Sequence, residues 1–204
     1  MSTDQKPFAP ACERNQEPIR ATLAALLPEP SRVLEIGSGT GQHGVYLCRH
    51  LPHLQWQPTD LPEALPGLAQ WVDESGLDNL SRPRALDVTA PPADITAAYD
   101  AVFTANTLHY VSWPVLQSLL ECSAVALRHG GQLLAYGPFN HNGEYSSDGN
   151  RSLDAWLKER DPEIGIKDLQ SVAAMALDMG LDLVAQHPMP ANNQILQFFR
   201  RERS

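Results

Sequence analysis

The chain has 204 residues, 43% hydrophobic and 19% charged, which is the composition of a folded globular protein and not of a disordered one. Its formal net charge of −9 opposes binding to the phosphate backbone of a nucleic acid and favours a small-molecule or protein substrate. No apolar run reaches membrane-spanning length, and the first residues lack the apolar core of a secretory signal. The sequence therefore predicts one cytoplasmic domain over residues 1–204, without a membrane partner.

Residues 1–30 are expected to form a helical cover over a sheet. Leucines at helical spacing lead to Pro28 and Pro30, which end the helix. In a second interpretation, the run Glu13-Arg14-Asn15 forms a wall of a ligand pocket, which makes Asn15 a candidate binding residue.

A strand, a glycine turn and a helix follow at residues 32–49. Val33, Leu34 and Ile36 suit a buried parallel strand, but Glu35 interrupts them and needs a polar partner or a ligand. The next residues allow a tight turn and a close approach of the backbone to a ligand, and the helix after them presents free amides. They are Gly37, Ser38, Gly39, Thr40 and Gly41.

This turn has two interpretations. A literal Gly39-x-Gly41-x-x-Gly44 match is the dinucleotide fingerprint, which predicts a nicotinamide-dependent oxidoreductase. However, the fingerprint should begin where the strand ends, at Gly37, and in that register its third glycine falls on Gln42. A strand carboxylate followed by Gly-x-Gly-x-Gly instead resembles motif I of class I S-adenosylmethionine (SAM) methyltransferases.

Two further predicted strands each end at an acid. Asp60 follows residues 54–59, at the position where βαβ folds use a carboxylate to accept hydrogen bonds from both ribose hydroxyls. Asp87 and Val88 end the strand 83–88, where class I methyltransferases contact adenine, although Asp87 could equally cap the next turn.

The fourth predicted strand, residues 99–106, delivers Asn106 and His109 to the edge where open α/β sheets hold ligands. After a helix at 114–127, a glycine turn leads into a fifth strand that ends at Phe139. Residues 140–165 are expected to form a lid-like insertion, because their first part is a long polar stretch at the end of a strand. A helix is predicted within this insertion at 153–160, and another follows it at 167–179. Residues 181–184 and 194–199 alternate like a terminal antiparallel hairpin. The order predicts a Rossmann-like α/β fold whose seven-stranded sheet is mostly parallel.

Several stretches together resemble one family, the uncharacterised methyltransferase-like group of methyltransferase-like protein twenty-six, a domain of unknown function. The resemblance covers nearly the whole chain. Its motifs are Glu13-Arg14-Asn15, Leu34 to His43, Trp56-Gln57-Pro58-Thr59-Asp60, Leu86-Asp87-Val88, Tyr136-Gly137-Pro138-Phe139, Arg160-Asp161-Pro162, Gly165-Ile166-Lys167-Asp168-Leu169 and Met189-Pro190-Ala191-Asn192-Asn193.

The resemblance implies a SAM-dependent methyltransferase with SAM as cofactor and an unknown acceptor, expected to be a small molecule, although a protein remains open. The residues expected to bind SAM are Asn15, Glu35, Gly37, Ser38, Gly39, Thr40, Gly41, Asp60, Leu61, Asp87, Val88 and Asn106. His109 is the candidate base because an unperturbed imidazole titrates near neutrality, and Tyr136 and Asn192 could orient the acceptor. A SAM-binding protein that performs no chemistry is the alternative from a different class.

An alternative interpretation is a metal site at His43, His50 and His53, which share part of a predicted helical face. No nearby carboxylate or cysteine completes a ligand set, so the sequence predicts no bound metal.

Overall fold

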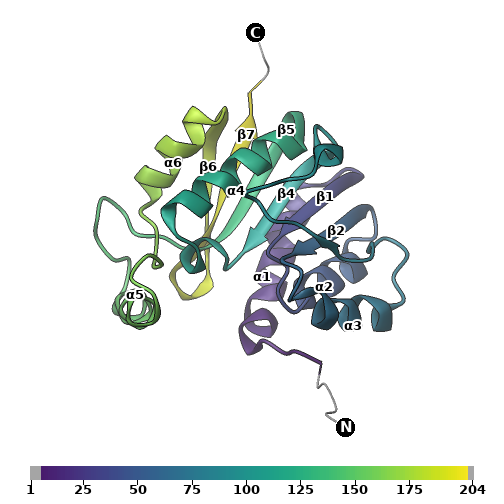
Figure 1. Cartoon of the computed structure of the whole chain (residues 1–204), viewed down its shortest axis with the longest axis horizontal. Helices are drawn as coiled ribbons and strands as arrows, with labels where there is room; N and C mark the ends of the chain where they lie inside the picture. Colours follow the sequence, from purple (N-terminus) through teal and green to yellow (C-terminus); the bar gives the residue numbers. More distant parts are fainter. Residues whose placement is uncertain (1–5, 202–204) are drawn as a thin grey trace. The chain divides into compact units, whose positions relative to one another are not determined.

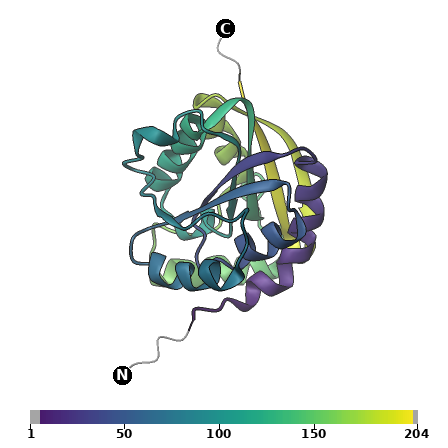
Figure 2. The same cartoon turned by 90° about the vertical axis from the view of Figure 1, so that its right-hand side faces the viewer.

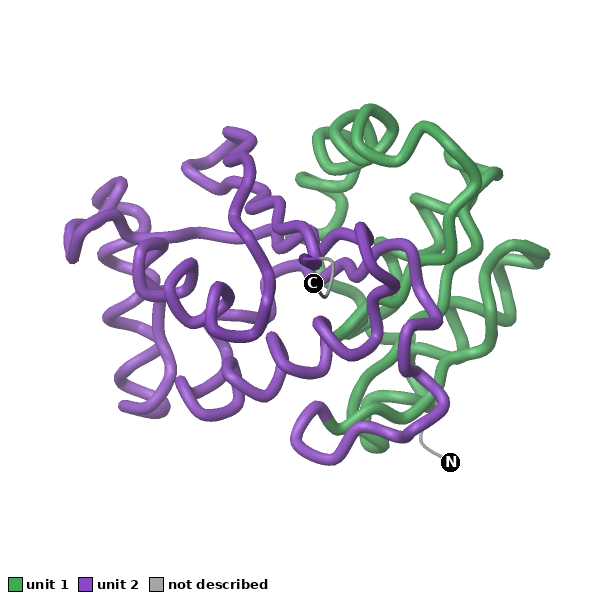
Figure 3. Tube along the Cα trace, turned by 90° about the horizontal axis from the view of Figure 1, so that it is seen from above, with its two compact units in different colours: residues 1–87 green, residues 88–204 purple. Residues whose placement is uncertain are grey.

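The computed structural model describes residues 6–201. The chain forms two compact units, Met1–Asp87 and Val88–Ser204 (Figure 3). Within the described residues the order of the seven strands is β3-β2-β1-β4-β5-β7-β6. No helix in this part of the chain is long and apolar enough to cross a membrane.

Unit 1 is a βαβ arrangement preceded by a helix. Its elements are α1 (Pro10–Leu26), β1 (Ser31–Ile36), α2 (Gln42–His50), β2 (Leu54–Asp60), α3 (Leu65–Ser75) and β3 (Arg84–Ala85). Strand β2 pairs in parallel with both β1 and β3, so the acids at the ends of these strands lie on one edge. Helices α2 and α3 lie side by side (Figures 1 and 2), and a Cβ at Gly41 would meet Leu68 Cδ1 at 2.5 Å. A side chain at Gly41 would displace Leu68, and the φ of 89° at this position also favours glycine before α2.

Unit 2 contains the rest of the sheet and the terminal hairpin. Its elements are η1 (Ala93–Ile95), β4 (Tyr99–Ala105), η2 (Leu108–Tyr110), α4 (Trp113–Ala126), β5 (Leu127–Pro138), α5 (Asp148–Arg160), α6 (Leu169–Asp178), β6 (Leu181–Met189), η3 (Pro190–Asn192) and β7 (Asn193–Arg200). Strands β4 and β5 are parallel, whereas β7 is antiparallel to both β5 and β6. The apolar residues Val102, Phe103, Leu133, Leu134 and Phe198 are fully buried. The predicted mixed α/β fold with a C-terminal antiparallel pair is confirmed.

Three element boundaries differ from the sequence prediction. The strand expected over residues 83–88 contains only Arg84 and Ala85, both exposed, so little apolar burial holds a longer strand. Helix α5 begins at Asp148 and not near residue 153, because Ser147 Oγ caps it by accepting from Asn150 N at 3.1 Å. Strand β5 begins at Leu127, before the predicted glycine turn. The residues of that turn lie inside the strand, where the pairing of β5 with β4 is irregular.

Candidate active site

Glu35 is the buried polar centre of unit 1. It interrupts the apolar run of β1, one residue before the strand ends, and only 1% of it is exposed. One carboxylate oxygen, Oε2, accepts hydrogen bonds from Ser38 Oγ at 2.8 Å and from Trp56 Nε1 at 2.9 Å. Both donors are neutral, and no lysine, arginine or histidine of residues 6–201 forms an ion pair with Glu35.

The environment of Glu35 raises its pKa to about 7. Burial is the main cause, since a charged carboxylate loses its hydration there. The hydrogen bonds from Trp56 and Ser38 lower the pKa, and the nearby negative charge of Asp60 raises it. A cationic group of a ligand would therefore find an uncompensated carboxylate at the end of β1.

The loop after β1 has the backbone of a ligand-binding turn. Gly37, Gly39 and Gly41 have φ angles of 72°, 56° and 89°, which glycine adopts without strain. Ser38 N donates to Thr59 O at 2.9 Å, which fixes the loop to the end of β2. A Cβ at Gly39 would have no atom within 4 Å, so the loop is open on this side.

Asp60 ends β2 beside this loop. Its Oδ2 accepts from Gly39 N at 2.7 Å, and its Oδ1 accepts from Leu61 N at 2.8 Å. Each carboxylate oxygen can accept a second hydrogen bond. The main chain of Asp60 also accepts from Leu86 N at 2.9 Å, and the exposed Asp87 is the next residue along the chain. The backbone of β2 at Asp60 is thus hydrogen-bonded to the residue that precedes Asp87.

Asn15 lies on α1, where its side chain pairs with a buried histidine. His43 Nε2 is 2.8 Å from Asn15 Oδ1, and burial lowers the pKa of His43 to about 4. The ring is therefore neutral, so Nε2 donates and Asn15 accepts. From the sequence, His43 was predicted to belong to motif I or to a metal site, and its spacing from Asn15 carried no signal for this contact.

The three histidines of the metal alternative have separate partners. His50 Nδ1 is 2.8 Å from Tyr46 O, and His53 Nε2 is 2.8 Å from Leu27 O. Among the described residues, no group of three or more histidine, cysteine or acidic side chains could hold a metal ion.

A cavity of about 490 Å³ opens beside the glycine loop, within the size range of small-ligand sites. It lies between Gly39, Thr40, the N-terminal Pro7 and the beginning of α3. Gln42 fastens this N-terminal segment to the loop, because its Oε1 accepts from Ala9 N at 2.7 Å and from Thr40 Oγ1 at 2.9 Å.

His109 is the buried imidazole of unit 2, on the short turn η2 after β4. Its carbonyl accepts from Gly165 N at 3.0 Å, and among residues 6–201 its ring nitrogens have no hydrogen-bond partner. Burial, followed by the positive charge of Lys167, lowers the pKa of His109 to about 4. At neutral pH the ring is therefore a neutral imidazole that can accept a proton.

The other predicted residues of unit 2 lie on neighbouring segments. Asn106 has a φ of 56° directly after β4, and its N–H donates to Tyr136 O at 2.9 Å. Tyr136 is buried in β5. Asn192 is exposed on η3, and its carbonyl accepts from Asn150 Nδ2 at 3.4 Å.

Asp154 on α5 was not anticipated from the sequence, although it is 99% buried. Its Oδ2 accepts from Tyr145 Oη and Lys158 Nζ, both at 2.6 Å, and its Oδ1 accepts from Ile166 N at 2.7 Å. The Asp154 carboxylate thus joins the polar loop, α5 and the segment before α6. The only sequence signal for this buried carboxylate was the spacing of Asp154 and Lys158, four residues apart on a helix. Pairs with this spacing usually lie on the solvent-exposed face of a helix.

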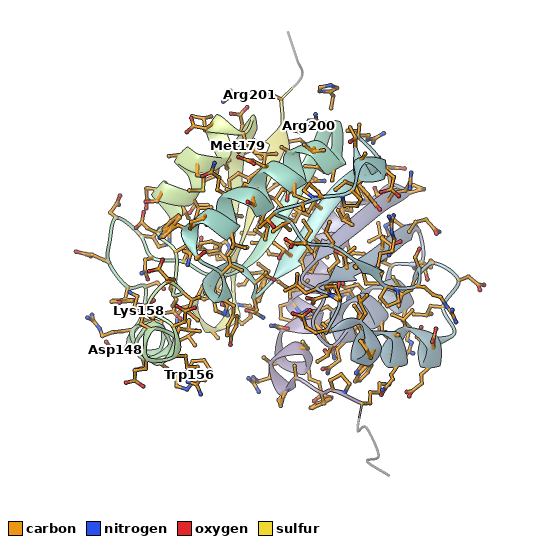
Figure 4. All side chains as sticks on the ribbon, viewed as in Figure 1. Asp148, Trp156, Lys158, Met179, Arg200 and Arg201 are labelled. Carbon is orange, nitrogen blue, oxygen red and sulfur yellow. The ribbon has the colours of Figure 1, made fainter. Side chains whose placement is uncertain are left out.

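A second cavity, about 400 Å³, lies in unit 2 beside the last residues of α4 and α6 and contains none of the predicted site residues. Figure 4 shows Met179, Arg200 and Arg201 at this end, with Trp156 and Lys158 on α5 at the other.

Comparison with known proteins gives the family. A family model described as a protein of unknown function, DUF938, matches residues 6–200. The chain belongs to the DUF938 family. The coarser part of the sequence prediction, a family of unknown function with a methyltransferase fold, is thereby supported.

Relatives of this DUF938 chain include methyltransferases. A segment of 105 residues is 30% identical to 3-hydroxy-5-methyl-1-naphthoate 3-O-methyltransferase of Streptomyces sahachiroi, covering 50% of this chain and 29% of the relative. The structure of the S-adenosylmethionine-dependent methyltransferase SibL matches 94% of this chain and 56% of its own, with a TM-score of 0.78 and 22% identity. The chain thus spans only part of these relatives.

A third similar structure has nearly the same length. It is described as a putative methyltransferase in complex with the Haloferax volcanii methyltransferase activator Trm112, and it matches with a TM-score of 0.73 at 17% identity, covering 94% of this chain and 92% of that one. These matches establish the class I SAM methyltransferase fold.

Proposed function

We propose that this DUF938 chain is a SAM-dependent methyltransferase that transfers the methyl group to an oxygen atom of a small molecule. The arrangement of Glu35, the glycine loop and Asp60 carries the proposal. The named activities of the naphthoate relative and of SibL support it. An acceptor oxygen is the choice that agrees with the 3-O-methyltransferase relative.

The residues of unit 1 fit SAM. Each Asp60 oxygen keeps one acceptor position for a ribose hydroxyl, and buried Glu35 has no cation, so it suits the methionyl ammonium. The open face at Gly39 admits the ligand beside the backbone. The other proposed cofactor residues are Asn15, Gly37, Ser38, Thr40, Gly41, Leu61 and Asp87 of unit 1, and Val88 and Asn106 of unit 2.

SAM supplies a methyl group already activated on a sulfonium, so the protein has mainly to align the acceptor and to receive its proton. In unit 2, neutral His109 would accept the proton of the acceptor hydroxyl. Tyr136 and Asn192 are proposed to orient the acceptor. Membership in the group of methyltransferase-like protein twenty-six and a cytoplasmic location are further proposals from the sequence.

Calorimetric titration with SAM and S-adenosylhomocysteine tests the cofactor assignment. We expect Asp60→Ala to weaken both affinities by roughly 100-fold, because two hydrogen bonds to a charged group are lost. Asp78→Ala, which removes an exposed carboxylate of the same unit, is the control and should bind like the wild type. A folded wild-type protein that binds neither compound would contradict the proposal, and NADH binding that survives excess SAM would favour the oxidoreductase.

His109→Ala tests the candidate base once an acceptor is known. We expect the turnover number to fall by about 100-fold or more, with cofactor affinity unchanged, because only proton transfer is lost. The acid limb of the wild-type rate should lie near pH 4, since that is the pKa of His109 in the fold. His129→Ala, at an exposed histidine of unit 2, is the matched control. Undiminished turnover in His109→Ala would exclude the base.

A further inference from the structure

Lys167 is a buried cation next to the candidate base. It lies between Gly165 and α6, and only 2% of it is exposed. Its Nζ donates to Val111 O at 2.7 Å and to Gly165 O at 3.0 Å. Gly165 N in turn donates to the carbonyl of His109, so the ammonium and the imidazole are held by the same two short segments.

The charge of Lys167 has no counterion in the described part of the chain. Both of its hydrogen bonds go to neutral carbonyl oxygens, which leaves the third N–H of the ammonium group without a partner. Burial lowers its pKa, against a smaller opposing effect of Asp154, whose carboxylate is bound to Lys158. Because burying an ammonium without an anion is unfavourable, an anionic ligand would stabilise this position.

Lys167 and His109 each lie beside a partly exposed aromatic ring. Lys167 Nζ lies 5.5 Å from the centre of the Trp113 ring, and the rings of His109 and Tyr110 are 4.6 Å apart. Trp113 is 37% exposed and Tyr110 is 51% exposed, so both rings are accessible. Flat exposed rings beside a few polar groups are typical of sites for aromatic ligands.

The side chains of Lys167, His109, Trp113 and Tyr110 indicate which chemical groups a ligand here would carry. Lys167 offers a positive charge and a free N–H, and the neutral ring of His109 offers a nitrogen that accepts from a hydroxyl. We propose that Lys167 binds the acidic group of the methyl acceptor, and that the acceptor is an aromatic compound carrying both a carboxylate and a hydroxyl. In this arrangement the carboxylate pairs with Lys167, the hydroxyl reaches His109, and the ring lies against Trp113 and Tyr110. The inference rests on the proposed methyltransferase function and adds the substrate class.

A structural role for Lys167 makes a different prediction. If the ammonium only holds the Val111 and Gly165 carbonyls, its replacement destabilises the fold and changes the affinity for acidic and neutral ligands equally. If it binds an anion, the loss is selective for acids. The charge of the ligand therefore separates the two roles.

The first experiment uses wild-type protein and two matched pairs of probes, salicylate and para-hydroxybenzoate, each against its methyl ester. Affinities are measured by calorimetry with and without S-adenosylhomocysteine. We expect at least one acid to bind roughly 10-fold or more tightly than its ester, since one hydrogen bond to a charged group is lost in the ester. Equal affinity within each pair, or no binding of any probe, would overturn the inference.

The second experiment compares Lys167→Met with Lys167→Arg and with Lys158→Met, which removes a lysine that already has a carboxylate partner. Lys167→Met should abolish the preference for the acid, whereas the other two variants should keep it. Thermal unfolding and S-adenosylhomocysteine binding verify that each variant is folded. Retention of the preference in folded Lys167→Met would refute the inference. A folded wild-type protein that does not bind S-adenosylhomocysteine would instead refute the proposed function. The probe affinities measured without S-adenosylhomocysteine test the inference about Lys167 independently of that result.

Discussion

Glu35 in unit 1 and Asp154 in unit 2 are both 1% exposed, and each accepts a hydrogen bond from a hydroxyl group. Their remaining partners differ. Glu35 receives only the neutral indole N–H of Trp56, whereas Asp154 also receives the Lys158 ammonium and a backbone amide. Burial raises the pKa of both, but for Asp154 the hydrogen bonds from Lys158, Tyr145 and Ile166 outweigh burial, and its pKa is lowered.

The difference separates a structural carboxylate from one available to a ligand. Asp154 already has its cation, so it stabilises the fold and has no need of another partner. Glu35 has no cation within residues 6–201, so its charged form is unfavourable until one arrives. Burial alone does not distinguish these roles; the charge of the donors does.

Asp154→Ala should produce the largest change in stability. It leaves Tyr145 Oη and Ile166 N without an acceptor and frees Lys158, and we expect the free energy of unfolding to fall by about 3–4 kcal/mol. Urea denaturation measures the loss, with the exposed Asp148→Ala on the same helix as control. A loss below about 1 kcal/mol would show that the Asp154 contacts are not structural.

The pH dependence of stability should show the opposite behaviour of Glu35. Its pKa rises from 4.5 in the unfolded chain to about 7 in the fold, so its contribution is complete below pH 4.5 and is lost as the pH rises through 7. We expect a loss of about 3 kcal/mol, which Glu35→Gln should not show. Urea denaturation of both proteins from pH 5 to pH 8 isolates this group. Parallel profiles would mean that Glu35 titrates normally.

The affinity for SAM should also depend on the protonation of Glu35. If the methionyl ammonium pairs with the Glu35 carboxylate, SAM binding requires that the proton leave, and the affinity should fall roughly 10-fold from pH 8 to pH 6. Calorimetry in buffers of different ionisation enthalpy would detect the released proton. An affinity independent of pH, without proton release, would place the ammonium elsewhere.

The smallest effect is expected for Tyr145→Phe, which removes one of three hydrogen bonds to Asp154 and leaves the Lys158 pair intact. We expect a loss of about 1 kcal/mol in urea denaturation. A loss as large as that of Asp154→Ala would show that the tyrosine, and not the lysine, is the main partner.

The sequence predicted best where the relevant partners are close along the chain. Glu35 stands out because it interrupts an apolar strand, and Ser38, which donates to it, is three residues away. The alternation of residues 181–184 and 194–199 likewise predicted the hairpin that β6 and β7 form. Such patterns depend on periodicity and turn chemistry, which the sequence displays directly.

Contacts between residues that are far apart in the sequence could not be predicted. Lys167 meets the carbonyl of Val111, 56 residues earlier, and Asp154 meets the amide of Ile166, 12 residues later. Neither spacing matches the periodicity of a helix or a strand. From the sequence, Lys167 and Asp154 therefore look like ordinary solvent-exposed residues. The short β3 was overestimated for a related reason, because Arg84 and Ala85 are exposed and only the neighbouring β2 determines where pairing stops.

The two amide contacts of Asp60 have a consequence for binding. Gly39 N and Leu61 N each donate to one of the carboxylate oxygens, so contacts within the chain fix the side chain. The side chain has therefore already given up its rotational entropy during folding, and a nucleoside that arrives does not have to order it again. Asp60 is thus preorganised, and the affinity that its hydrogen bonds provide is reduced little by conformational cost.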